Sequence, residues 1–137
     1  MNRNELQSLA RIRLKEARVL LKNGNYDGAY YLCGYVVECG LKACIAKKTK
    51  KHDFPDKITV NSSYSHNLTS LLGIAGLANP QKDERKINSK LAVYWTTVKD
   101  WDASSRYEKH SQKDAEDLYS AIVNKNDGVL QWIRKHW

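Results

Sequence analysis

The sequence predicts an all-α protein, an antiparallel up-and-down four-helix bundle with an additional short helix, in a single domain over residues 1–137. Apolar residues recur at steps of three and four along most of the chain, and no segment shows the sustained alternation typical of a strand. The chain has only 2 prolines and 7 glycines, so long irregular stretches are not expected. Mostly short connections between the periodic segments favour antiparallel neighbours.

The first two expected helices form a hairpin. Residues 5–22 carry a leucine- and alanine-rich stripe, Asn4 can cap this helix, and Asn23-Gly24 can end it. Asp27 is a good N-cap for a second helix over residues 28–48. This second helix is apolar almost all round through its first half, which predicts that it is the most buried helix of the bundle.

Small residues in the second expected helix also indicate that this helix lies at the centre of the bundle. Gly34 and Gly40 each cost a helix about 1 kcal/mol relative to alanine. We therefore expect them, with Ala29, Cys33 and Cys44, to form a small-residue face where another helix approaches closely. The cysteines are odd in number and lack C-x-x-C spacing, which argues against a disulfide framework or a zinc site. We therefore expect the cysteines to be reduced in the cytoplasm and to be buried as small hydrophobic residues. These cysteines are Cys33, Cys39 and Cys44.

The middle of the chain is expected to be less regular. Residues 49–64 are polar and basic and predict a loop. Ser65 can cap a short helix over residues 66–76, which Asn79-Pro80 would separate from the next one. The next helix is expected over residues 83–100. Its inward residues would be Ile87, Leu91, Tyr94, Trp95 and Val98.

A connection from Asp102 to His110 leads to the last expected helix, over residues 112–136. Ser111 precedes Asp114 at the spacing of a loose capping box, so it can begin this helix. Asp127-Gly128 is expected to kink it.

The net charge of +8 is unevenly distributed. Basic residues are in excess in segments 1–22, 42–57 and 81–113. Clustered positive charge attracts RNA or nucleotide phosphates, although a solvated basic surface that keeps the protein soluble is equally consistent with it. No segment approaches the roughly 20 apolar residues of a membrane span, and the N-terminus lacks a signal-peptide core. We expect a cytoplasmic protein without membrane contact.

Four stretches carry a family resemblance: residues 20–42 (LLKNGNYDGAYYLCGYVVECGLK), Ser65-His66-Asn67-Leu68, Trp101 followed by Arg106-Tyr107, and residues 128–133 (GVLQWI). The first resembles the signature hairpin of HEPN domains (higher eukaryotes and prokaryotes nucleotide-binding), and the others follow in the same order. The resemblance covers nearly the whole chain. It implies a helical bundle that binds nucleotide or RNA and is often a homodimer.

The family also suggests a biological setting. Many members are metal-independent RNases that act as toxins or defence effectors, and many are encoded beside a small nucleotidyltransferase. The resemblance therefore implies RNA or a nucleotide, and a small nucleotidyltransferase, as candidate partners within a toxin–antitoxin or defence context. It implies no cofactor and no metal.

Active members of the family resemble one another in an Arg-x4–6-His motif. Here Arg106 and His110 enclose three residues, which departs from that spacing. Metal-free RNA cleavage needs a base near neutral pKa and a cation that stabilises the developing phosphate charge. If the segment is helical, the four-residue step places both side chains on one face. Alternatively, Arg106 pairs with a buried carboxylate, and His110 is a surface residue ahead of the Ser111 cap.

Glu38 is the only charged residue between Asp27 and Lys42, and it shares a helical stripe with Tyr31 and Tyr35. A carboxylate there must be paired or must reach a polar cleft. By resemblance it corresponds to the polar residue on the second helix of the family, which would make it a third catalytic candidate that orients Arg106 or the ligand. The alternative is a simple Glu38–Lys42 surface pair.

Further candidates would bind nucleotide or RNA rather than catalyse. They are Lys42, Tyr107, Tyr31, Lys47 and Lys48. The lysine run continues through Lys50 and Lys51, and it also suits the negative end of a helix.

His66 is expected to orient the loop before the short helix, and His52 and His136 to be surface groups. Three functions stay open: nucleotide or RNA binding, metal-independent RNA cleavage by Arg106 and His110, and an adaptor role for a small nucleotidyltransferase.

Overall fold

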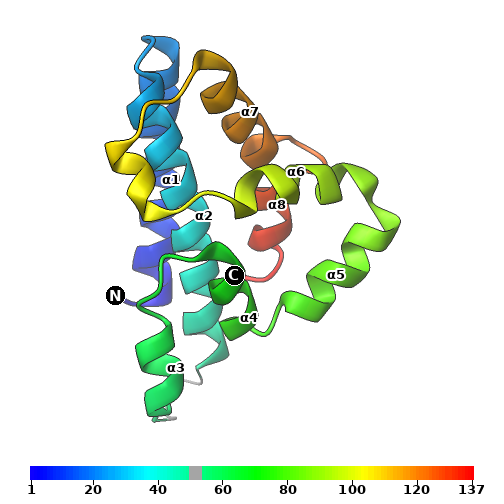
Figure 1. Ribbon diagram of the computed structural model, residues 1–137. Helices are drawn as coiled ribbons and strands as arrows, with labels where there is room; N and C mark the ends of the chain where they lie inside the picture. Colours follow the sequence, from blue (N-terminus) through cyan, green and yellow to red (C-terminus); the bar gives the residue numbers. More distant parts are fainter. Residues whose placement is uncertain (50–53) are drawn as a thin grey trace.

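The computed structural model describes residues 1–49 and 54–137, and all regular secondary structure in these ranges is helical (Figure 1). The predicted all-α class is confirmed. The elements are α1 (Arg3–Lys22), α2 (Tyr26–Lys48), α3 (Lys57–Ser62), α4 (Leu68–Ile74), α5 (Ala78–Ile87), α6 (Ser89–Lys99), the 3₁₀ helix η1 (Ala103–Tyr107), α7 (Gln112–Val123) and α8 (Val129–Arg134). None of the described helices combines the length and hydrophobicity needed to cross a bilayer.

Helices α1 and α2 form the predicted hairpin, with caps that differ from those expected. Asn2, not Asn4, caps α1, and its side chain shares a capping box with Glu5. At Gly24 the chain adopts a φ of 76°, which glycine tolerates without strain. Asn25, not Asp27, is the N-cap residue of α2, and its side chain makes no capping hydrogen bond. Asp27 lies inside the first turn and accepts a hydrogen bond from the distant His110 backbone.

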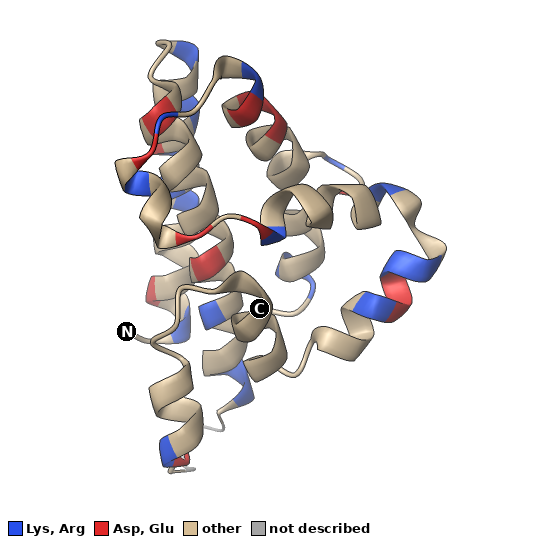
Figure 2. Ribbon diagram, viewed as in Figure 1, with Lys and Arg blue, Asp and Glu red and all other residues tan. Residues whose placement is uncertain are grey.

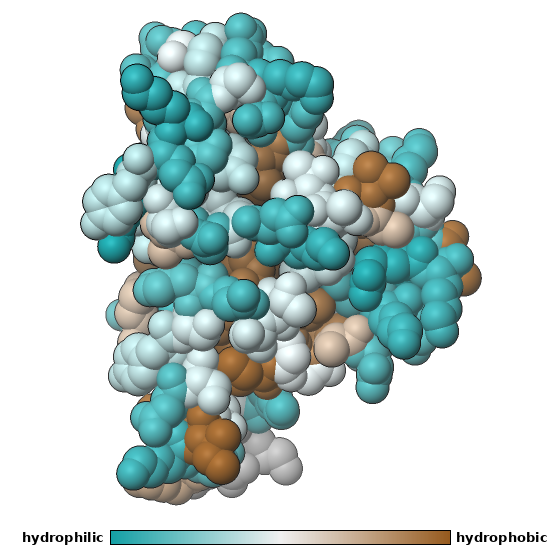
Figure 3. All heavy atoms as spheres, in the orientation of Figure 1, coloured by the Kyte–Doolittle hydropathy of each residue, from teal (hydrophilic) through white to brown (hydrophobic). Residues whose placement is uncertain are grey.

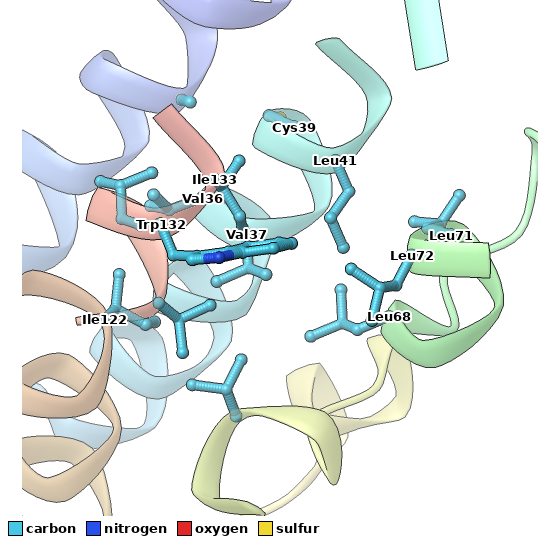
Figure 4. Packing of buried hydrophobic residues seen from close by; sticks show 14 of the residues in the cluster. Val36, Val37, Cys39, Leu41, Leu68, Leu71, Leu72, Ile122, Trp132 and Ile133 are labelled. Atoms are coloured by element: carbon cyan, nitrogen blue, oxygen red, sulfur yellow. The ribbon is translucent and has the colours of Figure 1, made fainter. Parts of the chain in front are cut away.

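Helix α2 is the centre around which the other elements pack. Its buried face includes Val36, Val37 and Leu41, all fully buried, and it contacts α1, α4, α7, α8 and η1. Figure 4 shows Trp132 of α8 lying among the α2 valines, while Leu68 and Leu72 of α4 extend toward Leu41. The outer face seen in Figure 3 is mostly hydrophilic, with scattered apolar patches.

The predicted approach of another helix to the small residues of α2 is confirmed at Gly40, whereas at Gly34 the close neighbour is Trp101, which lies between α6 and η1 rather than in a helix. A Cβ atom at Gly34 would lie 1.9 Å from Cδ2 and Cε2 of Trp101, so the indole packs directly on the helix backbone. A Cβ atom at Gly40 would lie 3.0 Å from Cγ2 of Ile133 in α8. Trp101 is 2 % exposed, so its side chain is buried almost completely.

The cysteines are buried and free, as expected for small core residues. They are Cys33, Cys39 and Cys44. Burial raises the pKa of the Cys33 thiol to about 12 and those of Cys39 and Cys44 to about 11.

The second half of the chain is more divided than predicted. The expected loop over 49–64 contains α3, capped by Asp56, while Lys50, Lys51 and His52 lie outside the described residues. The expected helix over 83–100 is instead two helices. Pro80 lies within the first turn of α5, where a backbone N–H has no intrahelical partner to lose.

Asn88 divides α5 from α6. Its backbone N–H donates to the Glu84 carbonyl at the end of α5, and its side chain accepts from the Leu91 N–H at the start of α6. Its amide nitrogen also donates to Asp127, 3.0 Å away. The expected inward residue Ile87 is 83 % exposed, because the break turns it away from the core.

The expected last helix, 112–136, is broken rather than kinked. Ser111 caps α7 as predicted, and its Oγ accepts from the Asp114 N–H. After α7, the Asn124 side chain accepts hydrogen bonds from the backbones of Asn126 and Asp127. This closes a turn from which α8 starts in a new direction.

We predict that Gly34→Ala destabilises the protein by about 3 kcal/mol, because the new methyl group overlaps the buried Trp101 indole. Gly73→Ala is the matched control, since nothing lies within 4 Å of a Cβ at that position in α4. The control should be neutral or stabilising by up to about 1 kcal/mol. Urea denaturation of both variants measures the difference, and equal stabilities would contradict the packing described here.

Candidate functional site

The Glu38 carboxylate is buried in the middle of α2 and is 4 % exposed. Its Oε1 lies 2.7 Å from Nδ1 of His66, and its Oε2 accepts a hydrogen bond from Nζ of Lys42 at 3.4 Å. With the carboxylate ionised, His66 must carry a proton on Nδ1 to donate in this contact. Glu38 does pair with Lys42, but the pair is not a surface pair, since burial of the carboxylate requires both partners.

His66 connects the loop before α4 to α2. Asn67, rather than the expected Ser65, caps α4, while Oγ of Ser65 accepts a hydrogen bond from the Asn67 N–H. These two bonds hold the backbone on either side of His66. The His66 side chain is 51 % exposed, so it links the buried carboxylate to the surface.

An aromatic cluster lies one to two turns before Glu38 on α2. The rings of Tyr31 and Tyr35 meet edge to face at 4.9 Å, and Trp101 contacts Tyr35 in the same way at 5.4 Å. Burial raises the pKa of Tyr35, and hydrogen bonding with Tyr31 and the charge of Glu38 raise it further. Tyr35 also meets the His66 ring at 6.3 Å, so the cluster is continuous with the Glu38 pair.

Arg106 projects from η1 onto this cluster. Asp102 begins η1 by accepting a hydrogen bond from the Ser104 N–H at 2.7 Å. The Arg106 guanidinium carbon lies 4.8 Å from the centre of the Tyr107 ring. Its pKa is raised, chiefly through hydrogen bonding with the Tyr31 side chain. Arg106 is exposed and forms no ion pair with any carboxylate in the described ranges.

His110 lies in a different environment. Residues 108–111 are not helical, so the expectation that Arg106 and His110 share a helix face is wrong. The His110 ring stacks on Tyr30 at 3.7 Å with an angle of 11° between the planes, and its backbone N–H donates to Asp27 at 2.5 Å. Tyr30 and Tyr31 point about 100° apart around α2, which places the contacts of His110 and Arg106 on different sides of the helix.

The surroundings of His110 are acidic. Acidic positions gather at the start of α7 and near η1 (Figure 2). Burial raises the pKa of Tyr30, and the charges of Asp114 and Glu108 raise it further. The His110 side chain is 10 % exposed, and its Nε2 lies 3.7 Å from a carboxylate oxygen of Glu108 but has no hydrogen-bond partner among the described residues. It borders a pocket of about 400 Å³ at the start of α2, together with Asp27 and Lys109.

A comparison with protein-family models identifies the family of the chain. The HEPN domain model matches residues 4–136. The chain belongs to the HEPN domain family. Membership supports a function related to nucleotides or RNA in general. Neither the curated proteins nor the solved structures gave a significant match.

The candidate residues of this HEPN domain do not form one site. Tyr31, Glu38, Lys42, Arg106 and Tyr107 belong to one continuous surface around the middle of α2. His110 does not, because it stacks on Tyr30 on another side of α2. Two lysines also do not, because they lie at the end of α2, about 24 Å along the helix from Tyr31. They are Lys47 and Lys48.

Lys48 donates to the Ile74 carbonyl at the end of α4. The contact places this lysine at the C-terminus of a neighbouring helix, whereas the sequence suggested the C-terminus of the helix that carries the run.

Two contacts of the site could not be predicted from the sequence. Trp101, although part of the family resemblance, carried no signal that it packs on Gly34 and supports the tyrosines. The Glu38–His66 contact joins residues 28 positions apart, and neither residue alone indicates the other. The isolated charge of Glu38 in an apolar helix was the usable signal, since it required a partner of some kind.

We predict that Glu38→Gln weakens RNA binding and changes stability by less than about 1 kcal/mol. The amide keeps the shape and an acceptor for His66, and it leaves only partly exposed cations without a partner, so no buried charge is stranded. Thermal denaturation and fluorescence polarisation with a labelled uridine hexanucleotide measure the two effects. Glu16→Gln, in the exposed pair with Arg13, is the control. A large loss of melting temperature with unchanged binding would show a purely structural ion pair.

Proposed function

We propose that this HEPN domain binds single-stranded RNA or nucleotides at a surface that we call the Arg106 face. The observation that carries the proposal is the exposed Arg106 guanidinium, which lies over an exposed tyrosine ring and has no carboxylate partner in the described ranges. The face consists of Tyr31, Tyr35, Lys42, His66, Arg106 and Tyr107.

The chemistry of the Arg106 face suits a nucleotide. A guanidinium offers donors in a planar arrangement that matches phosphate oxygens, and it is charged at any physiological pH. Tyr107 is 80 % exposed and can stack with a base. Lys42 and His66 lie beyond the tyrosines and can contact a neighbouring phosphate or ribose.

Binding is favoured over cleavage by the position of His110. A base for cleavage must reach the 2′-hydroxyl while Arg106 holds the adjacent phosphate. The His110 ring lies flat on Tyr30, on another side of α2, within acidic surroundings that repel phosphate. RNA cleavage by Arg106 and His110 stays a prediction of the sequence resemblance.

The wider setting is proposed from resemblance to the family. We place this protein in the cytoplasm as a homodimer, in a toxin–antitoxin or defence context, with a small nucleotidyltransferase as a candidate partner. The adaptor role is compatible with the Arg106 face, because RNA binding and a protein partner can use different surfaces of one domain.

We predict that Arg106→Gln lowers the affinity for a uridine hexanucleotide about tenfold. It should also make binding less dependent on salt, by the amount expected for the loss of one phosphate contact. The logarithm of the binding constant should then fall less steeply with the logarithm of salt concentration, by about 0.7. Fluorescence polarisation at several salt concentrations measures both quantities. Lys82→Gln, which removes one exposed charge on α5, is the matched control and should bind as the wild type. Equal effects of the two substitutions would refute the proposed site.

A further inference from the structure

A stripe of basic residues runs along one edge of α1. Arg11, Lys15 and Arg18 are spaced by four and three residues, so they lie on one side of the helix, and all three are exposed. Lys22 extends the stripe by one more turn. Successive positions rise by about 5.4 Å per turn, which gives a regular row of cations along the helix.

The stripe borders a pocket of about 230 Å³ where α1, α7 and α8 meet. Leu14, Tyr119, Leu130 and Trp137 supply its apolar and aromatic lining. Arg134 of α8 adds a fourth cation to the stripe residues that line it. The volume is below that of a typical drug-sized site, but it can hold a single ring system.

The cations around this pocket are held in place without being neutralised. The guanidinium carbons of Arg11 and Arg134 lie 5.2 Å and 5.8 Å from the Trp137 ring centre. Arg3 donates to the main-chain oxygen of Trp137 at 2.6 Å, which holds that residue against α1. Within residues 1–49 and 54–137, no carboxylate side chain forms an ion pair with Arg11, Lys15 or Arg134.

We propose that this α1 pocket is a second binding site for single-stranded RNA, with phosphates on the stripe and one base or ribose in the pocket. A row of regularly spaced cations beside an aromatic lining is the combination that single-stranded nucleic acids use. An acidic protein segment would match the charge but would leave the aromatic pocket unexplained. The choice of RNA as occupant rests on the proposed function.

The α1 pocket and the Arg106 face are built from different parts of the chain. The pocket uses α1, α7 and α8, whereas the face uses α2, η1 and the loop before α4. A short oligonucleotide held at the face therefore makes no use of the pocket. A longer strand that reaches both sites gains affinity from their combination, because the second contact is intramolecular.

The test compares a labelled uridine trinucleotide with a labelled 20-residue polyuridine RNA by fluorescence polarisation. The variant Arg11→Gln/Lys15→Gln/Arg18→Gln should bind the 20-mer at least about tenfold more weakly, with the salt slope reduced by about 2 for three lost contacts. Its affinity for the trinucleotide should be unchanged. The control Lys82→Gln/Lys90→Gln/Lys125→Gln removes the same charge from exposed positions elsewhere and should lose far less affinity.

Two results would overturn the proposal. In one, the stripe variant and the control variant lose 20-mer affinity equally, which would show only an effect of net charge. In the other, the stripe variant keeps its RNA affinity but no longer binds polyglutamate, which would show a surface for acidic protein. Lys15→Gln/Arg18→Gln leaves the Trp137 contacts in place and provides the same test if the triple variant folds poorly. Failure of the Arg106 face appears separately, as unchanged trinucleotide binding by Arg106→Gln.

Discussion

The contact between Trp101 and Gly34 brings the second half of the chain onto α2. Because Gly34 has no side chain, the indole lies directly against the helix backbone, where it supports both Tyr31 and Tyr35. Trp101 is also the residue from which the chain enters η1, so its position determines where Arg106 emerges. One glycine in a buried helix therefore links the packing of the core to the geometry of the Arg106 face.

Glu38 places a buried carboxylate in α2, between the tyrosines and Lys42. A buried carboxylate is stable only with partners, and His66 and Lys42 provide them from a loop and from the next turn of α2. The pair fixes the loop before α4 against α2 and leaves both partner side chains at the surface. The tyrosines, Arg106 and this pair thus form one polar and aromatic surface on an apolar scaffold.

Local patterns predicted the elements that depend on local chemistry. The α1–α2 hairpin, the close approach at Gly34 and the Ser111 cap follow from periodicity, glycine cost and capping spacing. The breaks at Asn88 and Asn124 were missed because each depends on side-chain bonds that compete with a continuous helix. The sequence pointed to Glu38 and Arg106 as single residues, whereas their partners come from distant segments that only the fold brings together.

The central claim is that ligand binds on the Trp101 side of α2. The four tryptophans give four indole N–H signals in a ¹⁵N-labelled sample. All four lie within the described residues, and among them Trp101 alone has ring contacts with the tyrosines of the Arg106 face. Titration with a uridine trinucleotide, followed by two-dimensional NMR, reads these signals directly. Our account predicts that the Trp101 indole signal shifts with saturation while those of Trp95 and Trp132 stay in place. Saturable shifts at Trp95 or Trp132 with an unmoved Trp101 signal would contradict it.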